Sequence, residues 1–143
     1  MPKIFNIIML LAIITLAGCS GQIEDKPDYT INDLFHDGEG DLRIYYVWGD
    51  GCPICARAAP YINSLEDRYD VELIKIEVYG SRQNQATFSA LAQRYNVQAS
   101  GVPTIFIGQE SVTGYTTGTD ERIDSLIENC LENPESCQDP LQR

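Results

Sequence analysis

The sequence predicts an α/β domain with a central mixed sheet of about four strands, flanking helices and an antiparallel hairpin towards the C-terminus. Runs rich in β-branched and aromatic residues alternate with stretches of helical period, which is typical of a sheet covered on both faces. Only a short turn separates the last two strand-like runs, which predicts the hairpin. The 143 residues are enough for one domain of ordinary size.

The predicted elements follow the order β-α-β-α-β-β-α after a weak helical stretch at residues 31–35. The strands are expected at residues 43–48, 71–79, 104–107 and 111–115. The helices are expected at residues 52–69, 84–95 and 119–131. Thr119 or Asp120 is expected to cap the last helix. The aromatic side chains expected in the core are Tyr45, Tyr46, Phe88 and Phe106.

The start of the chain is predicted to lie outside the folded domain, which is assigned to residues 29–143. Lys3 supplies a short positive region, and residues 4–16 are nearly all apolar. Because this apolar run is too short to cross a bilayer comfortably, it suits the core of a secretory signal peptide.

The residues Leu16-Ala17-Gly18-Cys19, which follow directly, resemble the lipobox of bacterial lipoproteins. In that family the signal is cut before the cysteine, and the cysteine sulfur carries diacylglycerol. The resemblance implies a lipoprotein signal peptide at residues 1–18, a lipid on Cys19 and a lipid-anchored tether at residues 19–28. An ordinary cleaved signal and an uncleaved anchor are the alternatives.

Charge and cysteine content narrow the class of protein. The formal net charge is −11, and it is −12 without residues 1–18, whose one charged residue is Lys3. This argues against a nucleic-acid partner, since phosphate binding needs clustered Lys and Arg. Five cysteines would leave an unpaired thiol in an exported protein. With Cys19 lipidated, four remain in two close pairs, in a compartment where disulfides persist.

Cys52-Pro53-Ile54-Cys55 lies at a strand-to-helix junction, and this placement points to redox chemistry. With Cys52 at the helix N-terminus, backbone N–H groups and the helix dipole favour its thiolate, so its pKa is expected below the usual ~8.5. Cys52 then attacks a substrate disulfide, and Cys55 resolves the mixed disulfide. A zinc site would need two further Cys or His ligands, and the chain has a single histidine, His36, which is expected to be solvated.

Trp48-Gly-Asp-Gly-Cys52-Pro-Ile-Cys55 resembles the active site of the thioredoxin superfamily, including the tryptophan four residues before the first cysteine. Gly101-Val102-Pro103-Thr104 is similar to the cis-proline loop of that superfamily. The resemblance covers about residues 40–131 and implies a thioredoxin fold. It also implies a cis Val102–Pro103 bond and a substrate-binding surface formed by Trp48, Pro53, Val102, Pro103 and Thr104.

Two departures from the superfamily concern the chemistry of the site. Tyr46 stands where thioredoxins carry a buried acid, six residues before the first cysteine. Glu77 is a possible substitute proton acceptor, although a solvated charge at a strand end is the preferred interpretation. Ile54 replaces the histidine found before the second cysteine in DsbA-like and disulfide-isomerase sites, which favours a less oxidising couple and thus a reductase.

Cys130 and Cys137 are expected to form a structural disulfide, because Pro134 lets the tail turn back after the last helix. The alternative is a second redox pair that relays electrons to Cys52 and Cys55.

The resulting prediction is an extracytoplasmic thiol–disulfide oxidoreductase that needs no cofactor or metal. Its expected partners are the thiols and disulfides of exported proteins and a membrane redox partner that recycles it. Its expected location is the cell envelope, lipid-anchored on the extracytoplasmic side, which is the periplasm in a Gram-negative host. The alternatives are a Cu(I) metallochaperone-like module that uses the same two thiolates, and a docking subunit with an idle dithiol.

Overall fold

Four strands form one mixed sheet in the order β2-β1-β3-β4 in the computed structural model, which describes residues 26–143. β1 pairs in parallel with β2 and antiparallel with β3, and β3 pairs antiparallel with β4. The strands are β1 (Leu42–Trp48), β2 (Val71–Glu77), β3 (Thr104–Ile107) and β4 (Glu110–Thr113). The predicted fold class, with its C-terminal antiparallel hairpin, is therefore confirmed.

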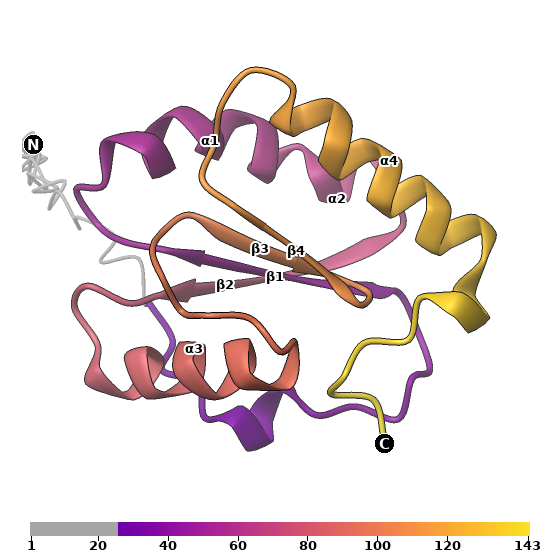
Figure 1. The fold of residues 1–143 in the computed structure, drawn as a ribbon, viewed down its shortest axis with the longest axis horizontal. Coiled ribbons are helices and arrows are strands. Elements are labelled where there is room, and N and C mark those ends of the chain that lie inside the picture. Colours follow the sequence, from indigo (N-terminus) through magenta and orange to yellow (C-terminus); the bar gives the residue numbers. More distant parts are fainter. Residues whose placement is uncertain (1–25) are drawn as a thin grey trace, which may run out of the picture.

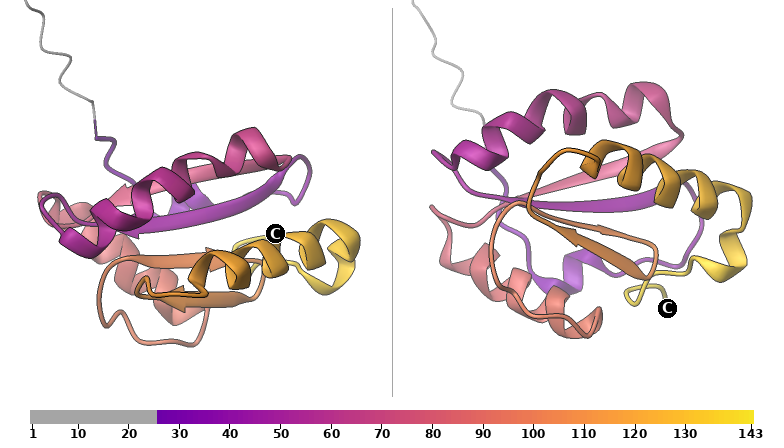
Figure 2. Two further views of the ribbon diagram at one scale, coloured as in Figure 1. Left: turned by 90° about the horizontal axis from the view of Figure 1, so that it is seen from above. Right: turned by 45° about the horizontal axis from the view of Figure 1, so that its top comes forward.

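Helices cover both faces of the sheet, as Figures 1 and 2 show. One face carries α1 (Pro53–Asn63), α2 (Leu65–Arg68) and α4 (Thr119–Glu132). The other carries α3 (Arg82–Arg94) and the short 3-10 helix η1 (Ile31–Leu34). A second 3-10 helix, η2 (Pro134–Ser136), follows α4. In Figure 1 the described chain begins at the end of the sheet where β1 leads into α1, whereas the C-terminus lies towards the other end.

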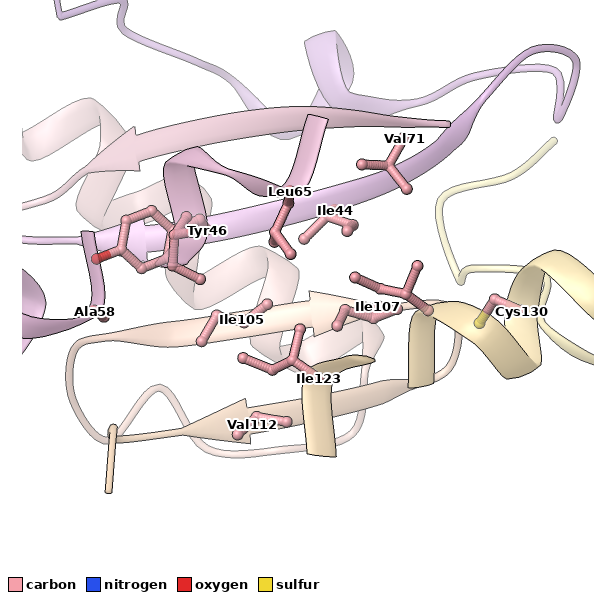
Figure 3. Packing of buried hydrophobic residues seen from close by; sticks show 12 residues of the cluster. Ile44, Tyr46, Ala58, Leu65, Val71, Ile105, Ile107, Val112, Ile123 and Cys130 are labelled. Atoms are coloured by element: carbon pink, nitrogen blue, oxygen red, sulfur yellow. The ribbon is translucent and has the colours of Figure 1, made fainter. Parts of the chain in front are cut away.

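Two hydrophobic clusters fill the space between these layers, because successive side chains of a strand point to opposite faces. Ile44 and Tyr46 of β1 belong to the cluster under α1 and α4, which Figure 3 shows. Tyr45 and Val47 belong to the cluster against α3. All four predicted core aromatics, Tyr45, Tyr46, Phe88 and Phe106, are buried.

Two details of the helices differ from the prediction. The helix expected at residues 52–69 is divided at Ser64, whose hydroxyl and backbone N–H both donate to the Tyr61 carbonyl and so compete with the regular helical pattern. The N-cap of α4 is Gly118 and neither Thr119 nor Asp120, because the Thr119 hydroxyl instead accepts a hydrogen bond from the backbone N–H of Thr116. Within residues 26–143, no helix has the length and apolar character needed to cross a membrane.

Candidate active site

A tight turn delivers the first cysteine to the start of α1. β1 ends at Trp48, and the carbonyl of Gly49 accepts a hydrogen bond from the backbone N–H of Cys52 at 3.1 Å. Gly51 takes a φ of +73°, which glycine adopts without the steric cost a side chain would meet. Cys52 is thereby the N-cap of α1, and Pro53 occupies the first helical position, where its missing N–H costs nothing.

Cys52 and Cys55 are joined by a disulfide at this helix N-terminus. The backbone N–H of Cys55 donates to the Cys52 sulfur at 3.1 Å, so the sulfur takes the place of an N-cap oxygen. Cys52 is 8% exposed and Cys55 only 3%, which makes Cys52 the more accessible sulfur. A cavity of about 380 Å³ opens beside the pair, lined among others by Trp48, Pro53, Ala59, Asn63 and Lys75.

The predicted cis-proline loop lies opposite the disulfide. The Val102–Pro103 bond is cis, and the Val102 carbonyl oxygen lies 4.0 Å from the Cys52 sulfur. Thr104 is 2% exposed, and its hydroxyl donates to the Gly101 carbonyl at 2.7 Å. A side chain this buried makes no direct contact with a substrate, so the contribution of Thr104 is to hold the loop in place.

Glu77 is buried at the end of β2 and is 4% exposed, so the preferred interpretation as a solvated charge is wrong. Its Oε1 accepts hydrogen bonds from the backbone N–H groups of Asp50 and Tyr79, both at 2.9 Å. Its Oε2 accepts one from Gly80 at 2.9 Å. The carboxylate therefore connects the turn before Cys52 to the loop that follows β2.

These contacts determine the charge state of Glu77. Burial raises the pKa of Glu77, but the backbone hydrogen bonds and the positive charge of Lys26 outweigh it and leave the pKa below its ordinary value. A carboxylate of lowered pKa with three N–H donors is a weak base. The geometry therefore supports a role in positioning the Gly49–Cys52 turn more strongly than the predicted alternative role in proton transfer.

Tyr46 stands at the position of the missing acid and lies beneath the dithiol. Its hydroxyl donates to the Cys55 carbonyl at 3.4 Å. Burial raises the pKa of Tyr46 to about 12, so the phenol stays neutral at physiological pH and takes up no proton there.

Several residues of the site were not predicted. Lys26 forms an ion pair with Asp50 at 2.9 Å, and its ammonium lies 5.2 Å from the centre of the Trp48 ring. Tyr79, in the loop after β2, is 60% exposed, and its ring lies beside Gly49. Its exposure has no sequence signature, since an apolar residue next to a strand end is usually assigned to the core.

The second pair, Cys130 and Cys137, is also joined by a disulfide. It lines a different cavity, of about 320 Å³, together with Leu42 at the start of β1. The dithiol instead borders Trp48 at the end of the same strand, which at ~3.3 Å per residue places the two disulfides about 20 Å apart. Direct exchange between them within one chain is therefore excluded in this fold.

His36 lies in this second cavity and is not the solvated side chain that the sequence predicts. Its Nε2 is 2.8 Å from Asp139 Oδ2, and its Nδ1 accepts a hydrogen bond from the Gly38 N–H at 3.1 Å. The imidazole thus ties the C-terminal segment to the loop before β1. Cys19 and the predicted signal peptide lie outside the described residues.

Comparison with known families identifies the chain. The model of the TraF family, described as F plasmid transfer operon protein, matches residues 32–116, more than half of the chain. The chain belongs to the TraF family. No curated protein matches it.

Solved structures similar to this TraF-family chain have the thioredoxin fold. A thiol:disulfide interchange protein DsbE from Chlorobium tepidum superimposes with a TM-score of 0.51 at 17% identity, over 66% of this chain and 83% of that one. Thioredoxin O2 from Arabidopsis thaliana gives a TM-score of 0.47 at 22% identity, over 69% and 82%. The DsbE similarity shows a shared fold, and the predicted thioredoxin fold is confirmed.

Proposed function

We propose that this TraF-family chain is a thiol–disulfide oxidoreductase of the cell envelope, anchored by a lipid on Cys19, that exchanges disulfides with exported proteins. The observation that carries the proposal is the placement of the Cys52–Cys55 disulfide. It caps a helix N-terminus, borders an open cavity and faces the cis-proline loop. Cys19 and the apolar residues before it support the location.

The reaction follows from the geometry. The reduced Cys52 thiolate attacks one sulfur of a substrate disulfide, forms a mixed disulfide and releases the other substrate sulfur as a thiolate. The Cys55 thiol then loses its proton and attacks the Cys52 sulfur. This releases the second substrate thiol and leaves the Cys52–Cys55 disulfide, so two electrons have passed to the substrate. A dithiol of a membrane redox partner restores the reduced state by the same two steps in reverse.

Reduction is the proposed direction. The Cys55 N–H bond to the Cys52 sulfur and the helix N-terminus stabilise the thiolate, which favours the reduced form of any such pair. Ile54, however, adds no charged or hydrogen-bonding group to that stabilisation. The couple is therefore expected to be less oxidising than one with a histidine at this position, which favours a reductase. TraF is described as a protein of the F plasmid transfer operon, which makes exported transfer proteins with disulfides the first substrates to test.

The experiment is to trap the mixed disulfide. With Cys55→Ser, the resolving thiol is gone, so Cys52 is expected to accumulate as a covalent adduct with a disulfide-containing substrate. Cys52→Ser is the matched control and is expected to form none. Failure of Cys55→Ser to form adducts with any protein disulfide or with glutathione disulfide contradicts the proposal.

Cu(I) binding by the reduced, unaltered chain tests the metallochaperone alternative. Within residues 26–143, no three His, Cys, Asp or Glu side chains are grouped to hold a metal ion. A Cu(I) ion at the dithiol would therefore take only two thiolate ligands from this part of the chain. Tight stoichiometric Cu(I) binding by the reduced chain, together with absence of disulfide exchange, would favour the metallochaperone.

A further inference from the structure

The segment that the sequence assigns to the tether packs beside the dithiol. Lys26 contacts Asp50 of the active-site turn and lies over the Trp48 ring. Asp50 is two residues from Cys52, and Trp48 lines the same cavity as both cysteines. The chain therefore enters the domain at the active-site end, as Figure 1 shows.

A buried asparagine fixes this entry point. Asn84, near the start of α3, is 1% exposed. Its Oδ1 accepts a hydrogen bond from the Tyr29 N–H at 2.7 Å, and its Nδ2 donates to the carbonyls of Pro27 at 3.1 Å and Glu77 at 2.8 Å. One side chain thus ties the entering segment to the strand end that carries the Glu77 carboxylate. All polar groups of this amide are used, which is the arrangement expected of a structural clamp.

The length of chain before this clamp limits how far the active site lies from an anchor on Cys19. Six residues separate Cys19 from Lys26, so the two are at most about 25 Å apart at ~3.6 Å per residue. The opposite end of β1, which shares a cavity with the Cys130–Cys137 disulfide, is about 20 Å farther along the strand.

We propose that residues 26–29 hold the Cys52–Cys55 end of the domain towards the membrane that anchors Cys19, so that it exchanges faster with membrane-bound partners whose cysteines lie close to the bilayer surface than with soluble exported proteins. This inference rests on the proposed function and on the proposed lipid. It differs from a freely tethered enzyme, whose active site would sample all directions and meet soluble exported proteins equally well.

The single tryptophan of the chain provides the probe, because Trp48 lies at the dithiol. The lipidated full-length protein is reconstituted into phosphatidylcholine vesicles that carry a headgroup-dansylated lipid, with the dithiol kept in one redox state. Energy transfer from Trp48 to the dansyl groups is then measured. Strong transfer is expected, and mass spectrometry must show the lipid on Cys19.

Two variants separate held orientation from mere attachment. A flexible insertion of about twenty Gly and Ser residues between Gly21 and Gln22 adds ~25 Å of reach, and is expected to lower transfer at least twofold. The same insertion after Arg143 is the matched control and should leave transfer unchanged. Lys26→Ala combined with Asn84→Ala keeps the chain length but releases the clamp, and it should also lower transfer, with near-UV circular dichroism checking the fold.

A second readout uses the chemistry. The rates of exchange with a lipid-anchored disulfide peptide and with the same peptide free in solution are compared for each variant. The insertion at residue 21 should lower the ratio of the two rates, while exchange with the free peptide stays unchanged. An unmodified Cys19, or transfer and rate ratios that the insertion does not alter, overturns the inference. Loss of exchange with the free peptide in the unaltered chain would instead contradict the proposed function.

Discussion

The two disulfides of this protein, with sequence separations of 3 and 7, lie towards opposite ends of β1, and their surroundings are opposite in electrostatic character. Cys52 caps the N-terminus of α1, where a backbone N–H points at its sulfur. Cys130 lies in the last turn of α4, where unpaired carbonyls give the helix end a partial negative charge and no basic residue compensates. A thiolate is therefore stabilised at the first position and destabilised at the second.

The neighbours of each disulfide match this difference. Cys52 and Cys55 border an open cavity, and the Cys52 sulfur faces the Val102 carbonyl of the cis-proline loop. The Cys130–Cys137 disulfide packs on the turn between β3 and β4, where a Cβ on Gly108 would collide with both sulfur atoms. Beyond it, Leu141 is fully buried and Asp139 binds His36, so the disulfide fastens a tail that belongs to the core. Helix polarity and packing thus favour a reactive role for the first disulfide and a structural role for the second.

The largest expected effect comes from removing the nucleophile. Cys52→Ser should reduce disulfide exchange to the uncatalysed background, because the serine hydroxyl is not ionised at neutral pH and cannot form a mixed disulfide. The rate of reduction of a protein disulfide by the variant, with dithiothreitol as electron donor, measures this. Retention of more than background activity would show that Cys52 is not the attacking group.

The converse change should affect stability and spare catalysis. Cys130→Ala combined with Cys137→Ala is expected to lower the free energy of unfolding by ~2–3 kcal/mol. Without the disulfide, the short loop between the two residues is no longer closed, so the unfolded chain gains conformational entropy. Urea unfolding measures the stability, and the disulfide-exchange assay should give an unchanged rate. A large loss of exchange at unchanged stability would make this pair a redox relay and refute the comparison.

A smaller effect is expected at the buried carboxylate. Glu77→Gln should lower stability by about 1–2 kcal/mol and slow exchange, because the amide cannot accept all three backbone hydrogen bonds that hold the Gly49–Cys52 turn. Glu72→Gln, at an exposed carboxylate that pairs with Arg43 near the start of the same strand, is the matched control. Equal effects of the two substitutions on exchange would contradict a positioning role for Glu77.

The pH dependence of stability gives a second test of Glu77. Its folded-state pKa lies below the ordinary value of 4.5, so its stabilising contribution is present above about pH 4.5 and is lost as the pH falls through the lower folded value. The stability difference between the unaltered chain and Glu77→Gln should therefore be constant near neutrality and shrink in acid. A difference that grows below pH 4.5 would mean that the folded-state pKa is raised.

The smallest effect is expected from Tyr46→Phe. It removes one long hydrogen bond, to the Cys55 carbonyl, and should cost less than ~1 kcal/mol. Because the pKa of Tyr46 is raised to about 12, the pH profile of exchange between pH 6 and 9 should not change. A shifted profile would show that Tyr46 takes part in proton transfer, which its raised pKa argues against.

Local patterns predicted the parts of the site that depend on adjacent residues. The cysteine spacing at a strand-to-helix junction located Cys52 at the N-cap, and the Val102–Pro103 motif located the facing loop. Contacts between segments that are distant in the chain have no comparable pattern in the sequence. The charge on Glu77 suggested solvation, whereas three backbone N–H groups of two loops compensate its burial. His36 was expected to be solvated and Lys26 had no predicted partner, and only the fold brings Asp139 and Asp50 to them.

The two disulfides are expected to differ in redox potential because of where they lie on their helices. The direct measurement equilibrates the full chain in thiol buffers of graded potential and quantifies the thiols of each pair by alkylation and mass spectrometry. Cys52–Cys55 is expected to be reduced reversibly within the catalytic range of about −270 to −120 mV, nearer the lower value, while Cys130–Cys137 stays oxidised to below about −300 mV. Reduction of both pairs at one potential, or of Cys130–Cys137 first, would show that helix position does not make Cys52–Cys55 the more readily reduced pair.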